Sequence, residues 1–300
     1  MTASTVTAVR AEPIGGARQV VADYFELTKP KVQSLLLLTT ITTMEVAGSP
    51  SLSRIGLTCV GGYLSAGGAG AVNHCYDRDL DAQMARTASR PIPAGRVSPR
   101  AALIYGLTLA GLSFLLLALT VNVLAASLAL GGFAGYVGVY TIWLKRRTPQ
   151  NIVIGGAAGA IPPLVGWAAT RGSLSWTAIY LFAIVFYWTP PHFWALSLLM
   201  KDEYAKVGVP MMPVARGERE TRRQIVLYTL LLYATTQLPF CAGEFGAVYL
   251  AASIPLGLMF ISGSVLLYLR ADRRSALRLY LFSLLYLALL FGAMVADVKL

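Results

Sequence analysis

The stretch "LTCVGGYLSAGGAGAV" (residues 57–72), followed at once by "NHCYDRDLDAQMARTASRP" (residues 73–91), decides the fold. The first part is apolar and rich in glycine, and the second is crowded with aspartates and arginines. The charges therefore begin where a membrane-like segment runs out. This contrast raises the question of why a very hydrophobic chain gathers acids at that point.

The composition indicates a polytopic membrane protein of the all-α class. The 300 residues are 56% hydrophobic and only 13% charged, whereas soluble domains carry about 25% charged residues. Apolar runs of about 18 or more residues recur along the chain, and the short alternating segments of a barrel are absent. The predicted transmembrane helices lie near residues 32–48, 55–76, 101–120, 122–143, 151–169, 175–199, 225–243, 246–269 and 276–296.

The distribution of positive charge predicts the orientation in the membrane. Of the 25 lysines and arginines, all but Arg54, Arg171 and Lys299 fall in the N-terminal segment or in the loops after the second, fourth, sixth and eighth spans. This is the positive-inside pattern, so we expect a cell-membrane protein whose N-terminus and acidic motifs are cytoplasmic. The net charge of +11 is then explained by the topology in the membrane. The lipid bilayer is an expected partner, and no nucleic acid is expected to bind.

Two domains are expected, a mobile cytoplasmic tail over residues 1–26 and a membrane domain of nine helices over residues 27–300. The tail is rich in alanine, threonine and valine. The three cysteines lack metal-ligand spacing and give no reason to expect disulfides or zinc.

The acids themselves suggest a magnesium site. Asn73, Asp77 and Asp81 are each four residues apart, so they share one face if the helix continues. Carboxylates this close need a cation, and Mg²⁺ takes one or two carboxylates together with phosphate oxygens. Arg86 and Arg90 have the same spacing, and arginine suits phosphate recognition. The alternative is a solvated loop rich in helix caps.

Two further polar clusters are predicted on the same side of the membrane. Asp202, Tyr204 and Lys206 follow the sixth span, and Tyr140 precedes Lys145 at the end of the fourth span. Clusters from different helices on one face can converge over a single pocket. The sequence thus predicts one shared site at the cytoplasmic end of the bundle.

Three segments carry a resemblance to a known family: residues 73–99, residues 140–169 and "TPPHFWALSLLMKDEYAKVGVPMMPV" (189–214). They resemble the protoheme IX farnesyltransferase family, a branch of the UbiA superfamily of intramembrane prenyltransferases. The similarity runs from about residue 27 to residue 214, and beyond that only hydropathy matches. The resemblance implies a nine-helix bundle around a central cavity that opens sideways to lipid. It also implies transfer of a farnesyl group from farnesyl diphosphate to a vinyl group of heme b.

The resemblance also implies roles for individual residues. The expected Mg²⁺ and diphosphate ligands are Asn73, Asp77, Asp81 and Asp202. The residues expected to contact the diphosphate or the heme propionates, or to cap the leaving group, are Arg86, Arg90, Lys145 and Arg146. Further substrate contacts are expected from Tyr140, Asn151, Tyr204 and Lys206. Many members of the superfamily carry a second DxxxD motif, whereas Lys206 stands four residues after Asp202. One firmly bound Mg²⁺ is therefore expected.

His192 follows two prolines within a predicted span. An imidazole at membrane depth is costly and usually has a partner. It is interpreted as an axial ligand of the heme iron or as an acid or base that assists hydration. The alternative is a hydrogen bond to a carbonyl that the prolines free.

Other functions stay open at this level. A quinone-ring precursor or another aromatic can replace heme as acceptor within the same superfamily. A secondary transporter is another alternative. Its ion site would lie near the membrane midplane, whereas these acids are predicted at the membrane edge. A heme carrier without transferase activity is a further alternative, and a homodimer or a contact with heme A synthase stays open.

Overall fold

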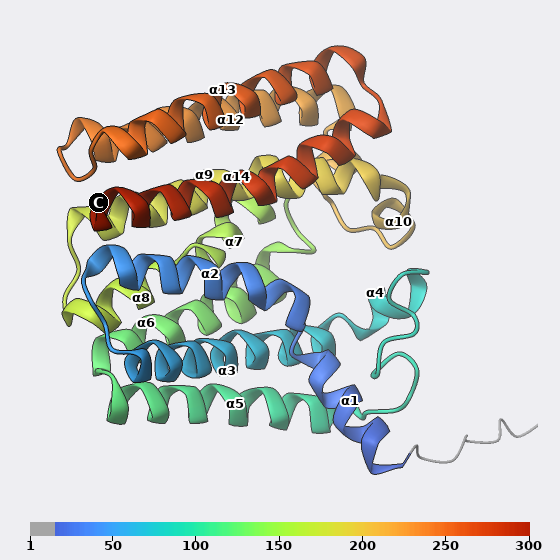
Figure 1. Ribbon diagram of the computed structural model, residues 1–300. Helices are drawn as coiled ribbons and strands as arrows, with labels where there is room; N and C mark the ends of the chain where they lie inside the picture. Colours follow the sequence, from blue (N-terminus) through green and yellow to red (C-terminus); the bar gives the residue numbers. More distant parts are fainter. Residues whose placement is uncertain (1–15) are drawn as a thin grey trace, which may run out of the picture.

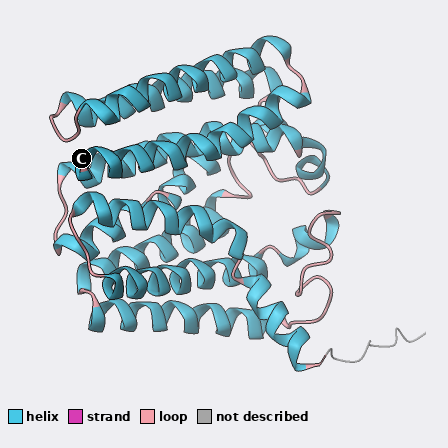
Figure 2. Cartoon of the chain, viewed as in Figure 1, coloured by secondary structure: helices cyan, strands magenta, loops and turns pink. Residues whose placement is uncertain are grey.

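The computed structural model describes residues 16–300, and every regular element in that range is a helix (Figure 2). The predicted all-α fold is therefore confirmed for the part of the chain described. The helices are α1 (Ala17–Leu27), α2 (Pro30–Ala47), α3 (Leu52–Tyr76), α4 (Arg78–Gln83), α5 (Pro99–Thr120), α6 (Val123–Ala134), the π-helix η1 (Gly135–Leu144), α7 (Asn151–Gly159), α8 (Ile161–Arg171), α9 (Trp176–Leu199), α10 (Lys201–Lys206), α11 (Met212–Ala215), α12 (Gly217–Cys241), α13 (Ala247–Arg270) and α14 (Arg273–Lys299).

Each predicted span coincides with a helix or with two consecutive helices. Among the residues described, six such segments are long and apolar enough to cross a membrane: α3, α5, α6 with η1, α7 with α8, α13 and α14. The helices α2, α9 and α12 lie at the other three predicted positions. They do not satisfy the combined requirement of length and hydropathy that the six segments satisfy.

The long helices lie beside one another and form a bundle with two distinct ends (Figure 1). The short helices α4 and α10 lie at one end, and the C-terminus lies at the other. Residues 1–15, which include most of the expected tail, lie outside the described residues. Residues 17–26 belong to α1, where Arg96 Nε donates to Asp23 Oδ1 at 2.9 Å and joins α1 to the loop after α4.

Polar caps define where the long helices begin. The side chains of Ser51, Ser98, Asn122, Ser175 and Asp272 accept hydrogen bonds from backbone amides three residues later, at the starts of α3, α5, α6, α9 and α14. Each cap satisfies an amide that has no partner within its own helix. Short polar turns therefore separate consecutive apolar helices.

Small residues bring α3 and α5 together. A Cβ atom added to Gly68 would lie 3.2 Å from the backbone nitrogen of Ala110, and one added to Gly106 would lie 2.7 Å from the carbonyl oxygen of Gly68. The two backbones are in contact, as predicted for glycines at these spacings in membrane helices. This packing holds the polar end of α3 in a fixed position.

The two proline pairs behave differently. Pro162 and Pro163 stand in the first turn of α8, directly after Ala160 interrupts the helix between α7 and α8. Pro190 and Pro191 lie inside α9, which continues as an α-helix from Trp176 to Leu199. The fifth predicted span is thus divided between two helices, α7 and α8.

Candidate active site

Asn73 and Asp77 form the buried centre of the charged end. α3 ends at Tyr76, but the amides of Asp77 and Asp81 still donate to the carbonyl oxygens of Asn73 and Asp77, at 2.9 and 2.8 Å. The helical spacing therefore continues across the junction between α3 and α4. Asn73, Asp77 and Asp81 are 3%, 1% and 5% exposed, and Asn73 Nδ2 donates to Asp77 Oδ2 at 2.7 Å.

The π-helix η1 supplies the opposite wall. Its hydrogen bonds span five residues, as in the bond from the Lys145 amide to the Tyr140 carbonyl at 2.9 Å. Asn73 Nδ2 donates to Thr141 Oγ1 at 3.1 Å, and Lys145 Nζ donates to Asp77 Oδ2. π-helical turns are rare and often occur at functional sites. Here the wider turn places Thr141 and Lys145 against the end of α3.

Arg90 folds back onto Asp81. Its Nη1 lies 2.9 and 2.8 Å from the two carboxylate oxygens of Asp81. The buried Thr87 hydroxyl donates to the Asp81 carbonyl oxygen at 2.8 Å and fixes the return of the loop. Arg86, four residues earlier, is exposed and makes no hydrogen bond within the described part of the chain.

Arg146 points toward the neighbouring acid. Its two terminal nitrogens donate to Asp79 at 2.7 Å each, and Nη2 also donates to the Tyr76 carbonyl oxygen at 2.9 Å. These hydrogen bonds lower the pKa of Asp79 and raise that of Arg146. Arg146 Nη2 also lies 3.8 Å from Asp77 Oδ1, at the edge of the central cluster.

Lys29 joins the cluster, although the sequence analysis assigned it no role in the site. Its Nζ donates to Asn73 Oδ1 at 2.5 Å and lies 3.4 Å from the hydroxyl oxygen of Tyr136. Lys29 has a φ of 54°, in the left-handed region, which costs an ordinary residue roughly 1–2 kcal/mol. A proline follows at position 30 and begins α2. In the sequence, the available signal is a lysine directly before a proline that begins an apolar run; the strained backbone is seen only in the structure.

The second acidic cluster approaches the first only in part. Burial raises the pKa of the Tyr204 hydroxyl; the charges of Arg86 and Arg90 oppose this shift, and the charge of Asp77 reinforces it. Tyr204 therefore lies within electrostatic reach of the α3 cluster. Asp202, by contrast, is exposed and makes no hydrogen bond or ion pair with the described residues.

Lys206 lies away from the central contacts, whereas Asn151 touches the cluster through the Lys145 carbonyl oxygen, to which its Nδ2 donates at 3.4 Å. Lys206 is exposed at the end of α10. Asn151 is fully buried, and its Nδ2 donates to the Thr148 carbonyl oxygen at 2.8 Å. It thereby supports the turn between η1 and α7. Tyr140 packs within η1 beside Tyr136, with ring centroids 5.4 Å apart.

His192 is held by α14. Its Nδ1 lies 2.7 Å from Ser283 Oγ, and that hydroxyl donates its only hydrogen to the Tyr280 carbonyl oxygen at 2.6 Å. Nδ1 must therefore carry the proton, which leaves the lone pair on Nε2. The ring stacks between Trp188 and Tyr280, with centroids 4.2 and 4.9 Å away. The partner of Nδ1 is thus Ser283 and not a carbonyl freed by the prolines.

The charges in the cluster indicate an anionic ligand. Three cations, Lys29, Arg90 and Lys145, face two carboxylates, Asp77 and Asp81. Burial, with the charges of Arg90 and Lys145, lowers the pKa of Lys29 to about 7. The site therefore has positive charge in excess, and binding of a polyanion would relieve the repulsion between these cations.

The same residues fit a divalent cation bound together with a phosphate group. Asp77 Oδ1 is buried and has no hydrogen-bond partner among the described residues, an arrangement that is costly unless a ligand fills it. The described side chains contain no group of three or more His, Cys, Asp or Glu that could hold a metal without help. A hard ion that takes one or two carboxylates and completes its shell with phosphate oxygens and water suits this donor set.

Comparisons with known proteins identify the family of the chain. The model of the UbiA prenyltransferase family matches residues 35–290. A protoheme IX farnesyltransferase of Symbiobacterium thermophilum is 54% identical over 93% of this chain and 95% of its own length. Another, of Chloroflexus aurantiacus, is 52% identical over 98% of this chain but only 50% of its own length. The chain thus spans about half the length of several relatives that it matches.

Solved structures show the same fold at low sequence identity. A structure described as digeranylgeranylglyceryl phosphate synthase has a TM-score of 0.77 at 18% identity, covering 94% of this chain and all of the other. A UbiA homolog from Archaeoglobus fulgidus, bound to GPP and Mg²⁺, has a TM-score of 0.66 at 16% identity, covering 91% and 99%. This chain is a multi-pass membrane protein, and it belongs to the UbiA prenyltransferase family.

Proposed function

We propose that the chain transfers the farnesyl group of farnesyl diphosphate to a vinyl group of heme b. The bond between the allylic carbon and the diphosphate oxygen breaks, and the vinyl carbon forms a new bond to that allylic carbon. Water then adds to the resulting cation and loses a proton, so the products are heme O and diphosphate. The 54% identity to the Symbiobacterium protoheme IX farnesyltransferase, over nearly the full length of both chains, carries this proposal.

The positively charged cluster suits the departure of diphosphate. Lys29, Lys145 and Arg90 already contact Asn73, Asp77 and Asp81 respectively. They are therefore placed before the reaction to stabilise negative charge on the leaving group. Removing one preorganised donor of this kind costs on the order of 3 kcal/mol of barrier. Arg86, Arg146, Tyr204 and Lys206 are proposed to contact the diphosphate or the heme propionates from the rim.

Asn73, Asp77 and Asp81 are the proposed ligands of one Mg²⁺, with Asp202 reaching the ion when substrate is bound. The ion would neutralise the diphosphate and act as a Lewis acid toward its oxygens. The unpartnered Oδ1 of Asp77 supports this assignment. Tyr140 and Asn151 are proposed to shape the pocket from η1 and α7, and the aromatic rings near the cluster would exclude water.

His192 is the proposed ligand of the heme iron. Ser283 keeps the proton on Nδ1, and a histidine presents its lone pair to iron when its other nitrogen donates a hydrogen bond. Nε2 of His192 makes no hydrogen bond with the described residues and is not fully buried. The residue as a whole is 6% exposed.

The proposed topology has nine membrane spans, with α2, α9 and α12 added to the six clear ones. They surround a central cavity that opens sideways to lipid. The N-terminus, α4 and α10 face the cytoplasm of a cell membrane, because the loops at that end carry most of the lysines and arginines. Residues 27–300 are proposed to form one membrane domain, with α1 preceding it on the cytoplasmic side.

The test is to incubate the purified protein with Mg²⁺, farnesyl diphosphate and heme b and to measure heme O by mass spectrometry. Heme O should form, and Asp77→Asn should abolish it without changing the helical circular dichroism. Glu220→Gln, which removes an acid from α12 outside the cluster, should retain turnover. Turnover with a hydroxybenzoate or a naphthoate in place of heme would contradict the acceptor, and normal turnover of Asp77→Asn would contradict the metal site.

A further inference from the structure

The three cations that the charge pattern leaves at the far end of the bundle meet at one place. Arg54 is in the first turn of α3, Arg171 is the last residue of α8, and Lys299 is the last residue of α14. Lys299 Nζ lies 3.1 Å from Glu45 Oε2 and donates to the Gly48 carbonyl oxygen at 3.1 Å. Residues far apart in the sequence therefore gather around the loop between α2 and α3.

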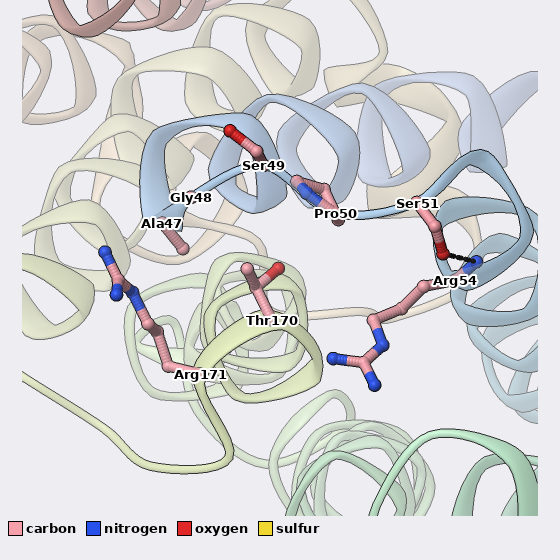
Figure 3. A pocket seen from close by; sticks show the side chains of 8 residues that line it. All are labelled: Ala47, Gly48, Ser49, Pro50, Ser51, Arg54, Thr170 and Arg171. Atoms are coloured by element: carbon pink, nitrogen blue, oxygen red, sulfur yellow. Dashed lines mark hydrogen bonds between the residues drawn. The ribbon is translucent and has the colours of Figure 1, made fainter.

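A pocket of about 270 Å³ lies between the two arginines (Figure 3). It is lined by Ala47, Gly48, Ser49, Pro50, Ser51, Arg54, Thr170 and Arg171. In Figure 3 the Arg54 and Arg171 side chains lie on opposite sides of Thr170. The lining thus combines two guanidinium groups with three hydroxyl groups.

Neither guanidinium has a partner within the described part of the chain. The bond that Arg54 makes is from its backbone amide to Ser51 Oγ, at 3.3 Å. Glu45, two residues before Ala47 of the pocket, pairs with Lys299. No acid lines the pocket, so its two positive charges are not neutralised there. Guanidinium groups bind phosphate through paired, charge-assisted hydrogen bonds.

The position of the pocket indicates where such a phosphate would come from. Leu52 and Trp176, which follow the caps of α3 and α9, are 87% and 73% exposed, and Leu174 in the loop between α8 and α9 is 40% exposed. Tryptophan is enriched at the level of the lipid headgroups. Arginine beside exposed apolar side chains keeps its charged group at the same level. The phosphates of the bilayer and the pocket therefore lie at the same depth.

We propose that Arg54 and Arg171 bind the phosphate group of one membrane phospholipid, at the end of the bundle opposite the candidate active site. The lipid phosphate lies between the two guanidinium groups, and its acyl chains run beside Leu52 and along the bundle. Its binding would join α3 and α8 through a ligand. The site is separate from the farnesyl transfer proposed above and does not depend on it.

Gly48 gives a second way to test the pocket without removing charge. A Cβ atom at residue 48 would lie 3.3 Å from Thr170 Cγ2 and 4.0 Å from Arg171 Cζ. Its φ of 167° is an extended conformation that any residue adopts. A larger side chain there would fill the space beside Arg171, and the Thr170 side chain would shift by a few tenths of an ångström to admit it.

The experiment uses the full chain in detergent and a phosphatidylglycerol that carries a photoreactive group. Mass spectrometry of the crosslinked peptides should place the lipid on residues 47–54 and 170–176. Arg54→Gln and Arg171→Gln should each weaken binding about tenfold, since each removes charge-assisted hydrogen bonds. The double variant and Gly48→Val should lose the crosslink. Arg274→Gln, which removes an exposed arginine at the other end, should leave it unchanged.

Competition identifies the ligand. Unlabelled phosphatidylglycerol should displace the probe, whereas a diacylglycerol with the same acyl chains, and inorganic phosphate, should not. Equal competition by diacylglycerol would show that the phosphate is not recognised, and equal competition by inorganic phosphate would show a free-phosphate site. Either result, or an unchanged crosslink in the double variant, would overturn the proposal. Because both arginines are exposed and their side chains donate to no described residue, the variants should elute and fold as the parent does.

Discussion

Replacing Lys29 by glycine should leave the fold at least as stable while removing most of the turnover. Lys29 has a φ of 54°, a conformation that costs an L-residue roughly 1–2 kcal/mol and costs glycine nothing. Glycine also increases the entropy of the unfolded chain, which offsets about 0.5–1 kcal/mol of that gain. The free energy of unfolding should therefore be unchanged or rise by up to about 1.5 kcal/mol.

The activity should fall because the glycine variant loses the ammonium group beside Asn73. That group lies 2.5 Å from Asn73 Oδ1 and 3.4 Å from Tyr136 Oη, where the proposed diphosphate would develop charge. Loss of a preorganised donor reduces kcat by about 10²–10³. Lys29→Met should lose as much activity, but it keeps the strained backbone and should gain no stability.

Ala271 supplies the matched control. Lys29 and Ala271 are the two residues other than glycine with positive φ in the described part of the chain, and Ala271 has a φ of 55° at the end of α13. Ala271→Gly should shift stability as Lys29→Gly does and leave heme O formation unchanged. The measurements are initial rates by mass spectrometry and denaturant unfolding in detergent.

Two outcomes would refute this reasoning. If Lys29→Gly keeps its turnover within about threefold of the parent, the ammonium group does not stabilise the leaving group. If Lys29→Gly loses more than about 2 kcal/mol of stability while Ala271→Gly does not, the contacts of Lys29 stabilise the fold. The strained backbone at Lys29 would then have no functional role.

Three further changes test the packing, the iron ligand and the metal. Gly68→Ala should lower the free energy of unfolding by about 1–3 kcal/mol, because the added Cβ meets the backbone of α5. Gly111→Ala should not lower it, because residue 111 has open space around it. Equal effects of the two changes would contradict the proposed packing. Ser283→Ala should weaken heme binding through His192 by about 10–100-fold in a titration of the Soret band, and Ser262→Ala should not. Removal of Mg²⁺ by EDTA should stop turnover and added Mg²⁺ should restore it; activity that persists would exclude the proposed metal.

The membrane fold could be predicted from the sequence because bilayer burial requires long apolar runs. The break after Gly159 was also foreseeable, since Pro162 and Pro163 cannot continue the preceding helix. The continuity of α9 through Pro190 and Pro191 was also predicted, because the apolar run over residues 175–199 contains both prolines. The contact of His192 with Ser283 was not predictable, because it joins α9 to a residue of α14 that lies 91 positions later in the chain.

The same division applies to the candidate site. The spacing of Asn73, Asp77 and Asp81 placed three side chains on one face, and the structure brings Lys145 and Arg90 to them. A spacing of four residues predicts only which side chains share a face of one helix. The approach of Lys29 depends on tertiary packing between α1, α2 and α3, and the exposure of Asp202 depends on the path of the chain after α9. Neither follows from spacing along the sequence.

The π-helix also has a consequence for the length of the chain. Its ten residues, Gly135–Leu144, are wound so that Lys145 faces Asp77. Deleting one residue from this segment would favour an ordinary α-helix, and everything after it would turn by about 100° about the axis. Lys145 would then leave the acid, although no side chain of the cluster had been changed. The register of η1 is thus encoded by its residue count as much as by its composition.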